Sequence, residues 1–401
     1  MAAPRPREGD SSAQARRQSG DGLARPLRDA ATGRWNGRAR TGDAALTPPP
    51  RAERFRKALS VRRLLWVSLV LIPADLLADL LGVRGVTLFV LSVLVLIPLA
   101  WLIGEATEQT GEYTGPAIAG LLNASFGNAP ELLIALFAVS NGLFDVVRGS
   151  LSGSVISNLL LVLGSALFIG GKGEVARRTT YGALGMVVLA MALFAIPSIA
   201  RNEIGGKAAL YLAGVPVAAV LVAVYITVTL RSVRREHREH QRSGEPGDPD
   251  WSLPRALVTL ALATVATAVI AELLIGSIQE FAQAVGLSKM FVAAVIVAIA
   301  GNAAEHGGAV MIASRGGIRL ASEIALQSAS QVAVGLIPAV ALLSLAIRPF
   351  PLAFSAVEFL GLGIAVAVPA VLLARGRSAR WHGPVLLAAY ACTVAAFFVA
   401  T

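Results

Sequence analysis

The sequence is poor in the residues from which disulfides, metal centres and hydrolytic active sites are usually built. Its single cysteine, Cys392, excludes an intramolecular disulfide and a CxxC metal site, and we expect it to be a packing residue in an apolar helix. The four histidines are scattered, and the chain has neither an HExxH motif nor a group resembling a serine triad. Charged residues make up only 15% of the chain, compared with about 25% in soluble domains. These absences argue against an enzyme and against a soluble protein, and we predict no cofactor.

Apolar residues make up 55% of the 401 residues and fall into long runs. A run of about 20 apolar residues is long enough to cross a bilayer as a helix. The sequence therefore predicts an all-α polytopic membrane protein with about eleven transmembrane helices. Their expected ranges are 63–82, 86–108, 114–140, 147–170, 180–200, 207–230, 253–279, 288–313, 319–345, 350–373 and 381–400.

The basic residues that give the chain its net charge of +10 are concentrated in the N-terminal stretch and in alternate loops. Residues 1–60 contain too few apolar side chains to form a core, so we expect a disordered, basic, cytoplasmic tail. We also expect a cytoplasmic linker at 231–252. By the positive-inside rule, and with an odd number of spans, the N-terminus lies in the cytoplasm and the C-terminus outside. This distribution predicts a protein of the plasma or inner membrane, in contact with the lipid bilayer, and argues against nucleic-acid binding.

Two copies of one short polar motif lie inside predicted spans: Gly127–Glu131, with the sequence GNAPE, and Gly301–His306, with the sequence GNAAEH. A charge near the middle of a span costs at least about 2.5–3.5 kcal/mol on insertion scales, so two glutamates there require an explanation. The copies lie in the third and eighth spans, which run in opposite directions.

The opposite directions of the two motifs predict an internal inverted repeat. We expect a leading helix at 61–84, a first five-helix repeat at 85–230, the linker, and a second five-helix repeat at 253–401. Secondary transporters commonly have this architecture, with the binding site between the repeats near the membrane midplane.

A serine followed by an amide residue comes after each motif at nearly the same distance. Asn158 follows Glu131 by 27 residues, and Gln331 follows Glu305 by 26 residues. We expect these side chains to contact the site directly or through water, or else to be hydrogen-bonding links between membrane helices. The four candidates are Ser157, Asn158, Ser330 and Gln331.

The motif residues suit a divalent cation. Calcium prefers six to eight oxygen ligands from carboxylates, carbonyls, amides and water, and two glutamates match its charge. Gly127 and Gly301 each lower helix stability by about 1 kcal/mol relative to alanine, and Pro130 removes a backbone donor. We therefore expect both helices to break just before the glutamate, where Asn128 and Asn302 can bond the freed backbone or bind the ion.

The same carboxyl groups explain coupling to protons. Burial disfavours the charged form of a carboxyl group, whereas a nearby cation favours it. We therefore expect the empty site to hold protons and the loaded site to be deprotonated, so that occupancy by one or the other gives antiport. His306, next to Glu305, is expected either to tune proton affinity or gating, or to be a structural hydrogen-bonded residue.

Further carboxylates lie in the spans that precede the two motifs. Glu108 lies in a cluster near the inner end of the second span, and Glu280 lies near the outer end of the seventh. We expect them either to attract cations at the two entrances or to be solvated helix ends. Glu272 lies deeper in the seventh span and is the better candidate for a carboxylate that acts on the site from behind its ligands.

At this point the sequence resembles a known family. Leu121–Leu132 resembles the first signature of the calcium/proton exchangers, within the cation/calcium exchanger superfamily, and Gly153–Gly164 resembles the helix that follows it. Gly301–His306 resembles the second signature, in which the trailing histidine is typical of this branch. The resemblance covers residues 63 to 400, approximately. The basic linker departs from relatives that carry an acidic helix there, which makes a calcium-sensing role for it doubtful.

The resemblance implies a single-ion exchanger that works by alternating access. Glu131 and Glu305 would be the alternating calcium and proton ligands, and the two serine–amide pairs would line the cavity. We therefore predict a calcium/proton antiporter that exports cytosolic Ca²⁺ in exchange for H⁺, with these two ions as its substrates. The alternatives are a sodium or potassium/proton antiporter of the same fold and, from a different class, a cation channel, whose flux would need no counter-ion.

Overall fold

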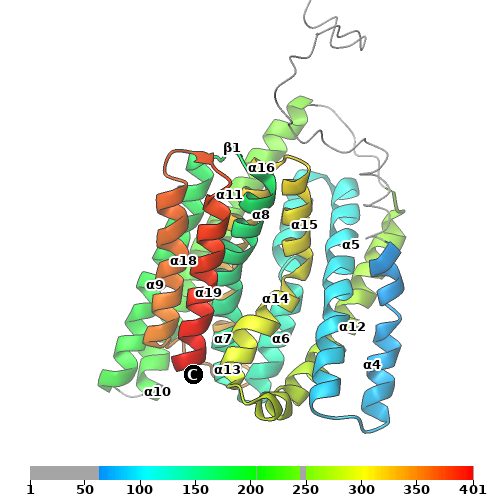
Figure 1. Ribbon diagram of the computed structural model, residues 1–401, viewed down its shortest axis with the longest axis vertical. Helices are drawn as coiled ribbons and strands as arrows, with labels where there is room; N and C mark the ends of the chain where they lie inside the picture. Colours follow the sequence, from blue (N-terminus) through cyan, green and yellow to red (C-terminus); the bar gives the residue numbers. More distant parts are fainter. Residues whose placement is uncertain (1–62, 205, 244–249, 401) are drawn as a thin grey trace, which may run out of the picture. The chain divides into compact units, whose positions relative to one another are not determined.

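The computed structural model of the chain describes residues 63–204, 206–243 and 250–400, which form an almost entirely helical bundle (Figure 1). The predicted tail at 1–60 lies outside the described residues. Two short strands, β1 (Gly173–Glu174) and β2 (Arg377–Ser378), pair antiparallel at one end of the bundle. We call this the linker end, because α11 (Val215–Ser243), which leads into the predicted linker, also ends there. The C-terminus lies at the opposite end (Figure 1).

Several helices are continued by π-helical segments, labelled η. The first half of the chain also contains α4 (Leu71–Leu80), α5 (Val86–Phe126), α6 (Ala129–Ser140), α7 (Phe144–Ile156), η1 (Ser157–Val162), α8 (Leu163–Gly170), α9 (Arg177–Ile204), α10 (Gly206–Ala209) and η2 (Leu210–Gly214). The second half contains α12 (Leu253–Val285), α13 (Lys289–Val292), η3 (Ala293–Val297), α14 (Ala298–Gly301), α15 (Ala303–Ser314), α16 (Ile318–Gln331), η4 (Val332–Leu336), α17 (Ile337–Ser344), α18 (Ala356–Leu372) and α19 (His382–Ala400).

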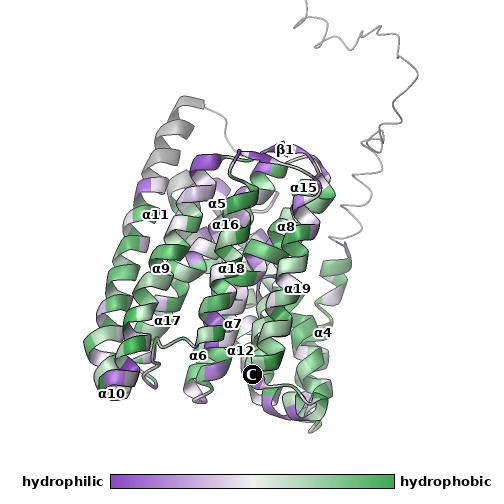
Figure 2. Cartoon of the chain, turned by 60° about the vertical axis from the view of Figure 1, so that its left-hand side comes forward, coloured by the Kyte–Doolittle hydropathy of each residue, from purple (hydrophilic) through white to green (hydrophobic). Residues whose placement is uncertain are grey.

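The described helices are long and apolar enough for a membrane protein. Seven of them have the length and hydropathy of a span, and the bent pair Lys289–Gly301 and Ala303–Ser314 gives an eighth. Two shorter apolar helices are Ala129–Ser140 and Ala356–Leu372. Hydrophobic residues dominate along the helices and hydrophilic residues gather towards their ends (Figure 2). The chain is therefore an all-α, multi-pass membrane protein, as predicted, whereas the number of eleven spans stays a prediction.

The long helix α5 folds back on itself. Residues eight positions apart in a straight helix are separated by about 12 Å. A Cβ atom on Gly111, however, would lie 2.8 Å from the Cβ atom of Ala119. The chain therefore reverses between these residues, which lies between the spans expected at 86–108 and 114–140.

Glycines allow α7 to contact the second half of the chain directly. A Cβ atom on Gly149 would lie 2.6 Å from the carbonyl oxygen of Met290, and one on Gly153 would overlap the carbonyl group of Ala294. Only a residue without a side chain permits such an approach of two backbones. The packing of α7 on α13 and η3 therefore joins the two halves close to the motif helices.

Polar contacts attach the leading helix and the linker to α5. Asp75 of α4 is fully buried and accepts a hydrogen bond from Ser92 Oγ of α5 at 3.0 Å. Near the linker end, Trp251 N donates to Gln109 Oε1 at 3.0 Å. The helix α11 continues to Ser243, so much of the described part of the predicted linker is helical.

Candidate functional site

Both copies of the polar motif interrupt a helix. Asn128, between α5 and α6, has φ −104° and ψ 19°. Asn302, between α14 and α15, has φ −91° and ψ 10°, and these two helices are bent by 60°. The low helix propensity of glycine and asparagine explains why the breaks fall at the same motif position. Glu131 and Glu305 each lie in the first turn of the new helix, where the helix dipole favours a negative charge.

Glu131 lies against the broken helix of the other half of the chain. It is 6% exposed. A Cβ atom on Gly301 would lie 3.3 Å from Glu131 Cγ and 3.7 Å from its Oε1. Gly301 belongs to the second motif and precedes Glu305 by four residues, so the two motifs lie side by side. The structure thus brings together two glutamates that are far apart in the sequence.

The amide side chains connect the two halves crosswise. Asn302 Nδ2 donates to Ser154 Oγ at 2.7 Å, and Asn302 Oδ1 accepts from Asn158 Nδ2 at 3.4 Å. In the other direction, Asn128 Nδ2 donates to Gln331 Oε1 at 3.5 Å. Each motif asparagine therefore pairs with the predicted amide of the opposite repeat.

Several polar atoms in this region are buried and have no hydrogen-bond partner among the described residues. They are Glu131 Oε2, Glu305 Oε2, Asn128 Oδ1, Asn158 Oδ1 and His306 Nε2. An unpaired buried polar group costs about 1–3 kcal/mol, so a cluster of them requires an explanation. Four of the five are carboxylate or amide oxygens, the ligand type that hard cations prefer.

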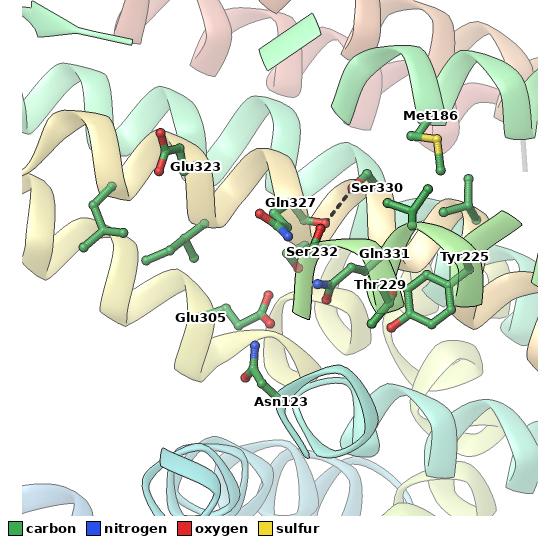
Figure 3. Close-up of a pocket in the computed structure, with 15 residues that line it drawn as sticks. Asn123, Met186, Tyr225, Thr229, Ser232, Glu305, Glu323, Gln327, Ser330 and Gln331 are labelled. Carbon is green, nitrogen blue, oxygen red and sulfur yellow. Dashed lines mark hydrogen bonds between the residues drawn. The ribbon is translucent and has the colours of Figure 1, made fainter. Parts of the chain in front are cut away.

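A cavity of about 330 Å³ reaches this region from the linker end (Figure 3). Leu320, Glu323 and Ser232 line its part towards the linker end, and Glu305 and Gln331 line its deep part. Tyr225 and Thr229 of α11 form one wall, opposite Asn123 and Glu305. Polar groups from α5, α11, α15 and α16 therefore surround a path to one of the two glutamates.

The two glutamates differ in their access to this cavity. Glu305 is partly exposed and lines it, whereas Glu131 is buried and is not among its described lining residues. The two serine–amide pairs differ in the same way, because Ser330 and Gln331 line the cavity while Asn158 is fully buried. Among the described residues, this cavity therefore reaches Glu305 and Gln331 but not Glu131 or Asn158.

Four other residues that were predicted to belong to the site are not among the described residues that line this cavity. Ser157 is fully buried, and its Oγ donates to the Ser154 carbonyl at 3.1 Å. Glu108, Glu272 and Glu280 are exposed and do not line the cavity. The roles predicted for them, attraction of cations at the entrances and support of the ion ligands, stay predictions.

Sequence reasoning did not select several residues of this region. Gln327 lies one helical turn before Gln331 and therefore on the same face of α16, a spacing that could have indicated it. Ser328 accepts a hydrogen bond from Asn158 Nδ2 at 3.1 Å. Tyr225 packs against Gly335, where a Cβ atom would lie 3.0 Å from the ring. No motif in the sequence distinguishes Tyr225 from other residues of its apolar span.

Two comparisons with known sequences found proteins that are similar to this chain. The family described as sodium/calcium exchanger protein matches residues 84–234 and 255–399. The Ca(2+)/H(+) antiporter ChaA of Bacillus subtilis is 34% identical over 340 residues, covering 82% of this chain and 96% of the relative. The vacuolar cation/proton exchanger 1a of Oryza sativa subsp. japonica is 35% identical over 353 residues, covering 82% and 78%.

Solved structures show the same fold. The Ca²⁺/H⁺ antiporter protein YfkE is similar with a TM-score of 0.72 and 30% sequence identity, over 84% of this chain and 99% of that one. The H⁺/Ca²⁺ exchanger CAX is similar with a TM-score of 0.61 over 84% and 92%, and at 14% identity it supports the fold alone.

Proposed function

Because this chain belongs to the sodium/calcium exchanger protein family, we propose that it exchanges Ca²⁺ for protons across a membrane. Membership confirms the family that the two motifs predicted, and it makes the chain a secondary transporter and not an enzyme. The relatives from Bacillus subtilis and rice are named for Ca²⁺ and for cations in general, so the choice of Ca²⁺ is the part of the proposal that needs testing.

One observation carries the proposal: Glu131 lies against the helix break of the other motif, and each motif glutamate keeps an oxygen atom without a hydrogen-bond partner among the described residues. Glu131 Oε2 and Glu305 Oε2 have no hydrogen-bond partner among the described residues, and Asn128 Oδ1 is likewise unpaired. Two carboxylates carry the charge that neutralises one divalent cation, and amide and carbonyl oxygens complete a set of hard ligands. The described residues contain no cluster of three or more His, Cys, Asp or Glu, so a site built from cysteine or histidine ligands is not favoured.

Protons compete for the same oxygens. Without a cation, two buried carboxyl groups near one another favour protonated forms, whereas bound Ca²⁺ favours both carboxylates. Release of the protons is therefore required for Ca²⁺ to bind, and release of Ca²⁺ allows the protons to return. This exclusive occupancy couples the two fluxes, provided that the site faces one side of the membrane at a time.

The difference between the two glutamates supports alternating access. Glu305 faces the cavity that leads to the linker end, while Glu131 is packed against Gly301. We infer that the linker end is cytoplasmic, from its excess of basic residues, and that this conformation loads Ca²⁺ from the cytoplasm. The alternate conformation would expose Glu131 to the opposite side, because the repeats are related by inversion.

The decisive experiment measures ion uptake into inverted vesicles that contain the purified full-length protein and an acidic lumen. We expect ⁴⁵Ca²⁺ uptake that collapses with the pH gradient and is absent in Glu131→Gln and in Glu305→Gln. The exposed Glu174→Gln, far from the site, is the matched control. Gradient-driven Na⁺ or K⁺ flux without Ca²⁺ movement would contradict the assignment of Ca²⁺ as the substrate. Ca²⁺ uptake that is independent of the proton gradient would indicate a channel.

A further inference from the structure

A second cavity, at the end of the bundle opposite the linker, has a lining of the opposite charge. Its volume is about 220 Å³, well above the roughly 10–15 Å³ that one water molecule requires. Arg148, Arg201 and Lys289 line it together with a single carboxylate, Asp145. The three cations come from α7, α9 and α13, so the fold and not one local sequence brings them together.

One of these cations is held in place by its neighbours. The side chain of Arg148 is only 13% exposed, forms an ion pair with Asp145, and has its Nε 3.7 Å from Glu358 Oε2. Glu358 is fully buried and is itself fixed by Ser355, whose Oγ donates to Glu358 Oε2 at 2.7 Å. Arg148 Nε nevertheless has no hydrogen-bond partner among the described residues. The guanidinium group is therefore oriented before any ligand arrives.

The other two cations have no ion-pair partner among the described residues. No described carboxylate forms an ion pair with Arg201 or Lys289, although both line the same cavity. A fourth basic residue, Arg348, lies beside Gly142, which lines the cavity. The cavity begins at the first turn of α7, whose backbone N–H groups add to the positive potential. The four basic residues thus outnumber the two carboxylates of Asp145 and Glu358 at this place.

We propose that this cavity binds a phosphate group, carried by inorganic phosphate or by the headgroup of an anionic phospholipid. Arginine presents a planar fork of donors that matches phosphate oxygens, and lysine adds a point charge. Arg148 is the preorganised donor, and Arg201 and Lys289 close around the ligand. The cavity lies at a bundle end, where phospholipid headgroups meet the protein surface, and it is separate from the glutamate site.

The experiment measures binding of ³²P-orthophosphate to the purified full-length protein at low ionic strength, together with the phospholipid that it retains after purification, determined by native mass spectrometry. The test variant is Arg201→Gln/Lys289→Gln. The control, Lys172→Gln/Arg375→Gln, removes two exposed charges at the linker end. Saturable orthophosphate binding that weakens about tenfold or more only in the test variant supports a site for the free ion. Retained anionic phospholipid that is lost only in the test variant supports a headgroup site.

Equal orthophosphate binding and equal phospholipid retention in the wild type and in the test variant would overturn the proposal, as would the absence of both ligands from the wild type. The single variant Arg201→Gln changes an exposed side chain. It supplies the same comparison if the double variant does not fold.

Discussion

The side chain of Glu131 rests on the backbone of Gly301, the glycine of the opposite motif. A Cβ atom at position 301 would lie 3.3 Å from Glu131 Cγ and 3.5 Å from its Cδ. At the other motif the nearest neighbour is different, since the three atoms closest to a Cβ atom on Gly127 belong to Asn123. The two motifs are therefore alike in sequence but differ in their nearest contacts.

The Gly301→Ala variant tests this contact. The added methyl group would force the Glu131 side chain to move by a few tenths of an ångström, which disturbs its position as a ligand. We expect about a tenfold loss of Ca²⁺ affinity, or about 1.4 kcal/mol, with folding preserved. The Ca²⁺ dependence of proton-driven uptake measures it. Gly307→Ala, on α15 with open space at its Cβ, controls for the gain in helix propensity. Equal affinities in the two variants would show that the contact is unimportant.

Replacement of each motif asparagine by alanine should lower the stability of the protein by different amounts. Asn302 donates to Ser154 Oγ at 2.7 Å and to the Ala298 carbonyl at 2.8 Å, whereas Asn128 has one long hydrogen bond of 3.5 Å. We therefore expect Asn302→Ala to lower the free energy of unfolding by about 1–3 kcal/mol and Asn128→Ala to lower it less. Thermal unfolding in detergent gives the comparison. Equal losses of stability would contradict this assignment of the hydrogen bonds.

Calcium binding should weaken as the pH falls. Protonation of either motif carboxyl group removes a ligand charge, so acid favours the proton-loaded site and alkali the Ca²⁺-loaded site. Equilibrium ⁴⁵Ca²⁺ binding measured between pH 6 and pH 8 should show a rising affinity and an unchanged number of sites. A constant affinity across this range would separate Ca²⁺ binding from proton binding and contradict antiport through a shared site.

His306 contributes a separate test of the same pH profile. Its Nε2 atom is buried without a hydrogen-bond partner among the described residues. We therefore expect this atom to take up or release a proton during exchange. We expect His306→Ala to shift the pH dependence of uptake more than it lowers the maximum rate. His306→Gln retains a polar group of similar reach and serves as the comparison. An unaltered profile in both variants would make His306 a packing residue.

The motifs themselves could be predicted from the sequence because their chemistry is local. Glycine and asparagine lower helix stability wherever they stand in a helix, which agrees with the breaks at Asn128 and Asn302. The inverted arrangement was predicted by counting spans between Glu131 and Glu305, and it stays a prediction. These predictions needed no knowledge of which helices pack together.

The partners of the polar groups could not be predicted, because they depend on packing. The spacing of Asn158 from Glu131 did not say which groups its amide would bond, and in the structure the amide donates to Ser328 and to Asn302. Tyr225 lines the cavity only because α11 passes close to η4, where Gly335 leaves room for its ring. Pairing across the repeats is a tertiary property, and motif spacing alone does not contain it.

Access from the linker end can be tested with single cysteines in a Cys392→Ser background. Gln327 is exposed and lines the cavity, so Gln327→Cys should react quickly with a membrane-impermeant thiol reagent applied from the linker side. Ser157→Cys, at a fully buried position, is the matched control and should react slowly. Reaction of Gln327→Cys only from the opposite side would contradict the inferred access from the linker end.

The contact between α7 and η3 should be needed for both stability and transport. A methyl group on Gly153 would overlap the backbone carbonyl of Ala294, which cannot move without shifting a helix. We expect Gly153→Ala to destabilise the protein by about 1–3 kcal/mol or more. Gly185→Ala, on α9 with nothing near its Cβ, should be neutral or stabilising. Asn158 follows Gly153 on the same span. Displacement of α7 should therefore also break the hydrogen bond from Asn158 to Asn302. Residual folded Gly153→Ala protein should therefore transport poorly, and full activity in it would show that the site tolerates separation of the two halves.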